Sequence, residues 1–93
     1  MDALIIFKYQ LDSRRVQPIE MPSHSQILSI QGQRDDICIW ALVNPKLPVV
    51  ARTFEIVLTG MPILPNSSYR KYLGTVLFDE GSYVTHIFER IPC

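Results

Sequence analysis

The apolar residues of this chain fall into short runs of β-branched and aromatic side chains, and this pattern most constrains the fold. The runs do not recur every three or four residues, as they would on one face of a helix, and they end at Pro, Gly, Asn, Asp or Ser. Such runs favour a pleated surface. We therefore expect an all-β fold, a small antiparallel sandwich or partly closed barrel. The six to seven predicted strands are Leu4–Leu11, Val16–Met21 (the shortest and weakest, because it contains Pro18), Ile27–Gln33, Ile37–Val43, Thr53–Thr59, Tyr72–Phe78 and Tyr83–Arg90.

The links between these strands predict which strands are neighbours. Gln33–Asp36 and Phe78–Ser82 are short and polar, which is typical of hairpins, and Gly81 can adopt a positive φ. Asn44–Pro48 is a longer loop whose prolines exclude a paired central strand. Gly60–Ser68 is long and apolar enough to fold back over one end of the sheet. The simplest interpretation is a meander.

Alternation along two of the runs predicts which faces are buried. Ile37–Val43 is apolar on both faces, which indicates a central strand that is covered on both sides. In Thr53–Thr59, apolar inward residues alternate with mostly polar outward residues, and the apolar Val57 at an outward position is the exception. The inward residues are Phe54, Ile56 and Leu58, and the outward residues are Thr53, Glu55 and Thr59.

Length and charge limit the classes of protein that this chain can represent. The 93 residues suffice for one domain, 1–93, and nine Lys+Arg balance nine Asp+Glu. This balance lacks the positive excess of a dedicated nucleic-acid binder, so we do not expect a nucleic-acid partner. No apolar run approaches the roughly 20 residues that cross a bilayer, so no membrane association is expected. Two cysteines, Cys38 and Cys93, predict free thiols in a reducing compartment.

The sequence contains no recognisable enzyme signature. It lacks a Gly-x-Ser-x-Gly elbow, a phosphate-binding Gly-rich loop and a His-Glu-x-x-His motif. Its two His and two Cys do not have the close spacing of zinc ligands. We therefore expect no enzyme, no catalytic residue, no cofactor and no metal.

Arg52 and Trp40 are candidates for binding an anionic ligand. Arg52 opens a predicted strand after the proline loop, where its guanidinium group can clamp an anion beside aromatic rings. The alternative is an ion pair between Arg52 and Glu55 or Asp79 at the sheet edge. Trp40 is either a stacking platform or an anchor of the core.

Arg70, Tyr72 and His86 complete the candidate set. Tyr69–Tyr72 interleaves basic and aromatic residues, a pattern typical of stacking on bases next to phosphates. His86 lies in the middle of a predicted strand, where it is either a ligand-binding imidazole or a half-buried side chain bonded to a neighbour. All five side chains are predicted ligand-binding or partner-binding residues.

The order of several short segments resembles a family of small, uncharacterised proteins encoded mainly by bacteriophages and prophages. The resemblance covers nearly the whole chain and rests on order and spacing, because each motif alone is unspecific. Met61 stands where the family pattern often has His. The segments are Lys8-Tyr9-x-Leu11, Ile19–Pro22, Ile27–Gln31, Cys38–Pro45, Arg52–Val57, Thr59–Ile63, Tyr72–Val76 and His86–Glu89.

This resemblance implies a phage accessory protein that acts in the cytoplasm of the bacterial host. We expect a non-enzymatic protein that binds and inhibits a host antiviral defence component by covering part of its surface. Two alternatives stay open: an oligomeric sponge that sequesters a defence signalling nucleotide, and a virion or assembly component. Because an edge strand in a small sheet invites self-pairing, a homodimer is also expected.

Overall fold

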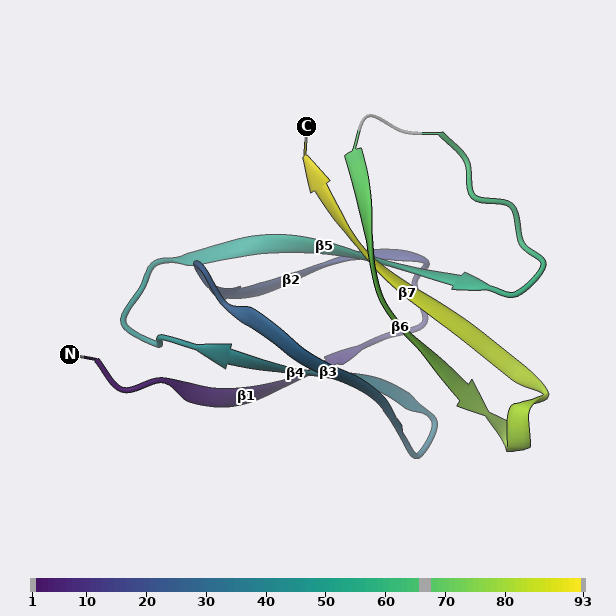
Figure 1. Ribbon diagram of the computed structural model, residues 1–93, viewed down its shortest axis with the longest axis horizontal. Coiled ribbons are helices and arrows are strands. Elements are labelled where there is room, and N and C mark those ends of the chain that lie inside the picture. The colour runs from purple at the N-terminus through teal and green to yellow at the C-terminus, as the bar shows by residue number, and fades with distance from the viewer. Residues whose placement is uncertain (1, 66–67, 93) are drawn as a thin grey trace.

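The computed structural model describes residues 2–65 and 68–92 and is built almost entirely from β-strands (Figure 1). A single 3-10 turn, Asp79–Gly81, interrupts them, and no helix in the described part of the chain is long and apolar enough to cross a membrane. All seven predicted strands are present, which confirms the all-β fold class. The strands are β1 (Ile5–Leu11), β2 (Val16–Pro22), β3 (Gln26–Gln33), β4 (Asp36–Val43), β5 (Val49–Leu58), β6 (Ser68–Phe78) and β7 (Tyr83–Pro92).

The strands form two antiparallel sheets, one ordered β1-β4-β3 and the other β2-β5-β7-β6. This arrangement is a sandwich rather than a closed barrel. The predicted meander is wrong for most of the chain, because only β3–β4 and β6–β7 are strands adjacent in sequence that also pair. The chain passes from one sheet to the other after β1, after β2 and after β4. After β5 it stays in the same sheet but skips one position, so that β6 forms the far edge and β7 pairs between β5 and β6.

Both predicted hairpins are confirmed, and each contains residues with positive φ. Arg34 has a φ of 59° in the β3–β4 turn. In the β6–β7 turn Asp79, Glu80 and Gly81 all have positive φ, and the amide of Ser82 donates to the carbonyl oxygen of Asp79. Residues with positive φ are typical of tight turns and do not continue a strand.

The core lies between the two sheets. As predicted, β4 is the central strand of its sheet, and Ile37, Ile39, Ala41 and Val43 are buried along its inner face. Cys38, on the other face of β4, is a buried free thiol, whereas Cys93 lies outside the described residues. The remaining buried core side chains come from both sheets, namely Leu11, Met21, Ile30, Phe54, Val76 and Ile87.

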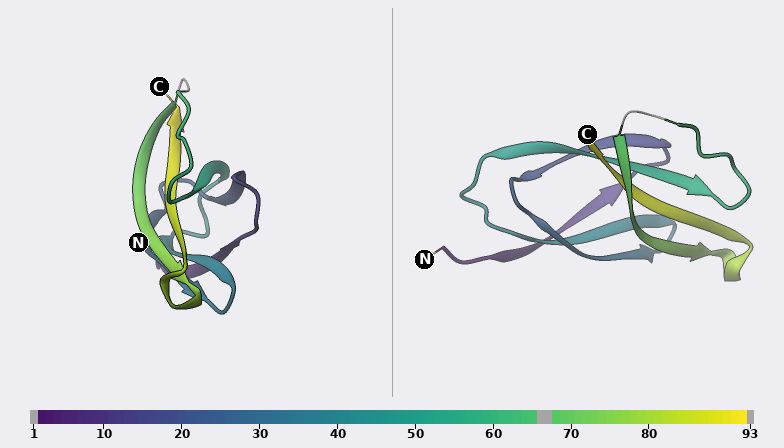
Figure 2. Two further views of the ribbon diagram at one scale, coloured as in Figure 1. Left: turned by 90° about the vertical axis from the view of Figure 1, so that its right-hand side faces the viewer. Right: turned by 45° about the horizontal axis from the view of Figure 1, so that its top comes forward.

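The two sheets approach most closely where β3 passes β6. A Cβ atom on Gly32 would lie 2.9 Å from Cγ1 of Val76, so the absence of a side chain permits this contact. The molecule is flat, with principal extents of 45 × 32 × 17 Å, and the left view of Figure 2 shows its narrow profile.

The loop after β5 returns alongside the four-stranded sheet, in agreement with the predicted fold-back of Gly60–Ser68. Figures 1 and 2 show the described part of this loop as an arch beside the first half of β6. Arg15 donates to the carbonyl oxygen of Pro62 (2.7 Å), and Arg70 donates to that of Leu64 (2.8 Å). These two arginines therefore attach the loop to the sheet.

Candidate functional site

The face of the four-stranded sheet that points away from the core, called the outer face below, carries three rows of cross-strand neighbours. The strand register places one residue of β5, one of β7 and one of β6 side by side in each row. Residues directly opposite one another in antiparallel strands share a face. The rows are Thr53–Arg90–Arg70, Glu55–Phe88–Tyr72 and Val57–His86–Thr75.

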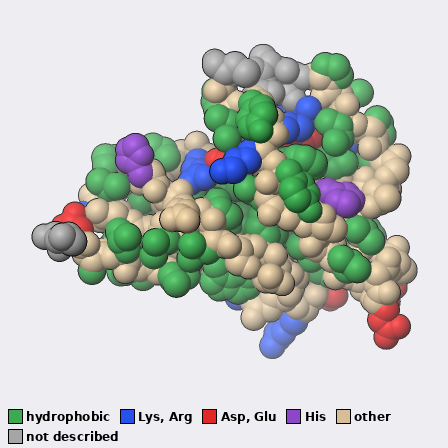
Figure 3. All heavy atoms as spheres, in the orientation of Figure 1, with side chains coloured by type: hydrophobic (Ala, Val, Ile, Leu, Met, Phe, Trp, Pro, Cys, Tyr) green, Lys and Arg blue, Asp and Glu red, His purple; other side chains and the backbone are tan. Residues whose placement is uncertain are grey.

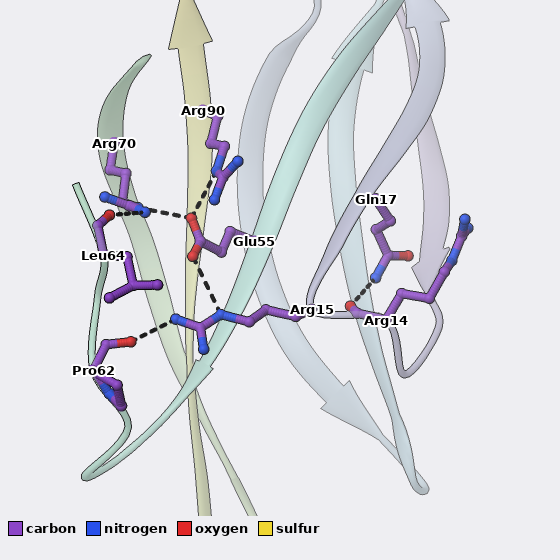
Figure 4. Close-up of polar contacts among 8 residues, drawn as sticks. All are labelled: Arg14, Arg15, Gln17, Glu55, Pro62, Leu64, Arg70 and Arg90. Carbon is purple, nitrogen blue, oxygen red and sulfur yellow. Dashed lines mark hydrogen bonds and ion pairs between the residues drawn. The ribbon is translucent and has the colours of Figure 1, made fainter. Parts of the chain in front are cut away.

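Glu55 is the centre of this face. It lies on the outer side, as alternation predicts, and its side chain is nevertheless only 1% exposed. The loop after β5 and three arginines cover it. Arg70 and Arg90 donate from Nε to Glu55 Oε1 at 2.7 and 2.9 Å, and Arg15 Nε lies 3.5 Å from Oε2 (Figure 4).

These four residues, called the arginine cluster below, hold more positive than negative charge. Three guanidinium groups face one carboxylate, and no other carboxylate of the described residues lies within ion-pair distance of them. Burial acts to raise the pKa of Glu55, but hydrogen bonds from Arg70 and Arg90 and their positive charges outweigh burial and lower that pKa. Glu55 is therefore ionised at neutral pH, and two positive charges remain without a counter-charge.

A second polar group lies further along the same face. His86 contacts the Thr59 hydroxyl through Nε2 (2.7 Å) and the Thr75 hydroxyl through Nδ1 (3.0 Å), while the Tyr72 hydroxyl lies 2.5 Å from Thr75 Oγ1. The Tyr72 ring also packs edge-to-face on Phe88, with centroids 5.7 Å apart. Of the two interpretations of His86, the structure has the half-buried histidine bonded to neighbours, which fixes its ring and orders Tyr72.

Arg52 lies on the opposite, inner face of the sheet. It forms an ion pair, as the alternative interpretation holds, but its partner is neither Glu55 nor Asp79. Two of its guanidinium nitrogens donate to the two carboxylate oxygens of Glu89 at 2.7 and 2.8 Å, and Nη1 donates to the carbonyl oxygen of Ser25. This closed pair leaves Arg52 little capacity to bind an anion.

An open groove of about 560 Å³ lies where the β2–β3 turn, β3 and β6 come together. Arg52 and Tyr72 meet at this groove, although they point to different faces of the sheet. Lys71 also lines it, and no carboxylate of the described residues lies within ion-pair distance of its ammonium group. The groove thus combines an aromatic ring with an unneutralised cation.

Trp40 is not part of either arrangement. It lies on β4, in the other sheet, and it is half-buried on the side of that sheet that faces away from the core. Its ring is 5.9 Å from the ammonium nitrogen of Lys8, a cation–π distance. Three of the five predicted residues, Arg70, Tyr72 and His86, therefore share the outer face, whereas Arg52 and Trp40 do not.

Sequence reasoning missed Glu55, Arg15 and Arg90 as members of the site. Arg15 follows another arginine, Arg14, but Arg14 points away from Glu55 (Figure 4) and forms an ion pair with Asp12. Glu55 and Arg90 alternate on their strands as ordinary outward residues do. These residues come together because of the register in which the strands pair, and no residue pattern within the separate segments predicts that register.

The outer face carries several groups that are typical of recognition surfaces. Guanidinium groups, aromatic rings and exposed apolar residues of the loop, including Met61, Ile63 and Leu64, lie on or next to it. In Figure 3 basic side chains lie among hydrophobic ones over this part of the molecule. Within the ranges 2–65 and 68–92, no group of three or more His, Cys, Asp or Glu side chains is placed to hold a metal ion.

The fold and the site define a small antiparallel β-sandwich whose four-stranded sheet presents a basic and partly aromatic outer face. Residues 3–92 match the family model described as Domain of unknown function (DUF7352). The chain therefore belongs to the DUF7352 family. No curated protein and no solved structure gives a match.

Proposed function

We propose that this protein is a non-enzymatic accessory protein of bacteriophage origin, which binds and inhibits a component of a host antiviral defence system in the bacterial cytoplasm. The phage origin rests on the resemblance of segment order described above. The binding role rests on the outer face of the four-stranded sheet. The protein acts by covering a surface of its partner, and no bond is made or broken.

The observation that carries the proposal is the arginine cluster next to exposed apolar loop residues. Arg, Tyr and Met are enriched at protein interfaces, and Arg and Tyr are frequent among the few residues that dominate the binding energy. The two positive charges without a counter-charge favour an acidic patch on the partner, since charge complementarity guides association and fixes orientation. A standard interface needs about 800 Å² from each partner, which the total surface of 6179 Å² can supply.

The proposal is tested in bacteria that each carry one defined defence system. Each strain is challenged, with and without this protein, by a phage that the system restricts. We expect plaque formation to recover in at least one strain, and the purified protein to bind one component of that system directly. Failure to restore plaques in every strain would count against the inhibitor function.

A matched pair of variants connects this activity to the outer face. Leu64 and Val49 are exposed aliphatic residues (66% and 60%), but only Leu64 lies in the loop beside the arginine cluster. Leu64→Glu introduces a like charge against an acidic partner and should abolish inhibition. Val49→Glu should preserve it. Equal activity of the two variants would place the interface elsewhere.

The nucleotide sponge is the second candidate, and the groove beside Lys71 favours it. A cation without a counter-charge next to the Tyr72 ring suits a phosphate and a stacked base. In thermal unfolding with a panel of mono-, di- and cyclic nucleotides, a true ligand at 100 times its Kd should add about 2.7 kcal/mol of stability. Lys71→Glu should remove this gain, and the exposed control Lys46→Glu should not.

A further inference from the structure

The free edge of β1 has only one of the usual features that protect a sheet edge, the charged residue Lys8. β1 pairs with β4 through a regular register over its whole length of seven residues, and it contains neither Pro nor a bulge. Proteins normally protect such edges with charged side chains, prolines, bulges or covering elements. The other three edges have them, since β2 contains Pro18 and Pro22, whereas β3 and β6 each have a register shift and pack against each other.

The first half of this edge is also apolar on both faces. Leu4, Ile5, Ile6 and Phe7 are consecutive, and their side chains are 37–57% exposed. Figure 3 shows hydrophobic side chains along the lower left margin, where Figure 1 places β1. An exposed apolar patch that continues along an unpaired edge marks an interaction site.

We propose that β1 pairs with β1 of a second copy of this chain, antiparallel and with the twofold axis at Ile5. In this register Ile5 faces its own equivalent, Leu4 faces Ile6 of the second copy, and Asp2 faces Lys8 of the second copy. The segment is therefore self-complementary: an acidic residue at one end, a basic residue at the other, and apolar residues between them.

Charge selects this register from the alternatives. Residues directly opposite one another in antiparallel strands lie on the same face of the sheet. The twofold axis must therefore pass through a residue, and the alternative registers differ in which residue that is. An axis at Lys8 would place two ammonium groups together, and an axis at Phe7 would place Asp2 opposite Asp12. An axis at Gln10 would bring Lys8 opposite Asp12, but it would leave Leu4–Phe7 without an apolar partner segment. Only an axis at Ile5 both brings Lys8 opposite a carboxylate and pairs the apolar residues with one another.

Both residues that form this contact are exposed in the monomer, where each also has partners in its own chain. The Asp2 carboxylate lies 3.5 Å from Lys46 and accepts a hydrogen bond from the Asn44 amide (3.1 Å), and because it is still 44% exposed it can also meet an ammonium group of the second copy. Lys8 donates to the side-chain oxygen of Gln33 on the outer side of the same sheet. Pairing would join the three-stranded sheets of two copies into one continuous sheet of six strands and bury both exposed apolar segments.

Charge exchange tests the pairing by sedimentation velocity over a range of concentrations. The wild-type chain should dimerise, and Lys8→Asp or Asp2→Lys alone should weaken the dimer about tenfold, because each change affects two symmetry-related pairs. The double variant Asp2→Lys/Lys8→Asp should restore the wild-type affinity. A monomer at the highest soluble concentration, or a dimer that neither single change weakens, would overturn the proposal.

Disulfide capture tests the register independently of stability. In a Cys93→Ser background, Ile5→Cys places two thiols at the twofold axis, where opposite Cα atoms lie about 4.5–5.5 Å apart and can form a disulfide. Phe7→Cys faces Ala3 of the second copy and should not crosslink. Rapid crosslinking of Ile5→Cys alone supports the register, whereas crosslinking of Phe7→Cys alone would refute it.

Discussion

Glu55 and Glu89 are buried on neighbouring strands of one sheet, and the protein neutralises them in opposite ways. Glu89, on the inner face, forms two hydrogen bonds with a single guanidinium group, that of Arg52, so positive and negative charges balance. Glu55, on the outer face, receives one hydrogen bond each from Arg70 and Arg90, and Arg15 approaches its second oxygen. The inner pair is closed, whereas the outer cluster retains donors and positive charge.

This difference teaches how similar residues can serve different purposes. A closed pair has no redundancy, and loss of one partner leaves a buried charge alone. A shared carboxylate keeps counter-charges when one arginine is lost, and the surplus guanidinium groups can meet a partner. We therefore assign a structural role to the inner pair and connect the outer cluster with the proposed binding function.

Arg52→Ala should produce the largest loss of stability. It leaves the Glu89 carboxylate buried without its arginine, which costs about 3–5 kcal/mol of unfolding free energy. Chemical denaturation measures the loss, and Arg52→Lys serves as the control because it keeps the charge but not the paired geometry. If Arg52→Ala costs no more than Arg90→Ala, the contrast between a closed pair and a redundant cluster is wrong.

Acid should destabilise the cluster through Glu55. Because the folded-state pKa of Glu55 is lowered, its contribution is present above the ordinary glutamate pKa and is lost as the pH falls through the lowered value. Below about pH 4 the wild-type free energy of unfolding should fall more steeply than that of Glu55→Gln, by at most about 1.4 kcal/mol per pH unit.

Asp12 provides the internal control for this measurement. Hydrogen bonds from Arg14 lower its pKa, so it also loses stabilisation in acid, but it is present in both the wild type and Glu55→Gln. The difference between the two proteins therefore isolates Glu55. Parallel pH profiles would contradict the assignment.

Arg90→Ala should have a smaller effect on stability, about 1–2 kcal/mol, because one charged hydrogen bond to Glu55 is lost while Arg70 and Arg15 remain. Thermal and chemical unfolding measure this loss. The double variant Arg70→Ala/Arg90→Ala should cost more than the sum of the single changes, since the redundancy then ends. Strict additivity would argue that the arginines act independently.

Arg15→Ala should have the smallest effect, below about 1 kcal/mol and weaker at high salt. Its Nε is 3.5 Å from Glu55 Oε2, and more than a third of its side chain is exposed. Loss of its bond to Pro62 should instead loosen the loop, which hydrogen exchange of the amides after Gly60 would detect. Arg14→Ala, which removes only the exposed pair with Asp12, is the matched control.

Much of the fold was predictable from the residues, whereas little of the site was. Every predicted strand is present, and the central place of β4 with its buried inner face agrees with its apolar pattern, although Trp40 and Leu42 on its outer side are only half-buried. The burial of Glu55 was not predictable, since a lone Glu at an outward position normally remains solvated. Nor was the pairing of Arg52 with Glu89, because these residues are separated by 37 positions in the chain.

The approximate positions of strands and turns, and the alternation of sides along a strand, were determined by the sequence alone, because alternation and turn chemistry act within a few residues. The exact starts were not, since β5 and β6 each begin four residues before the predicted run. Which strands pair, and in what register, was decided by the tertiary structure, because that choice depends on packing between segments far apart in the chain. The tertiary structure thus brings Arg15, Arg70 and Arg90 onto one buried carboxylate and leaves one edge of the smaller sheet open.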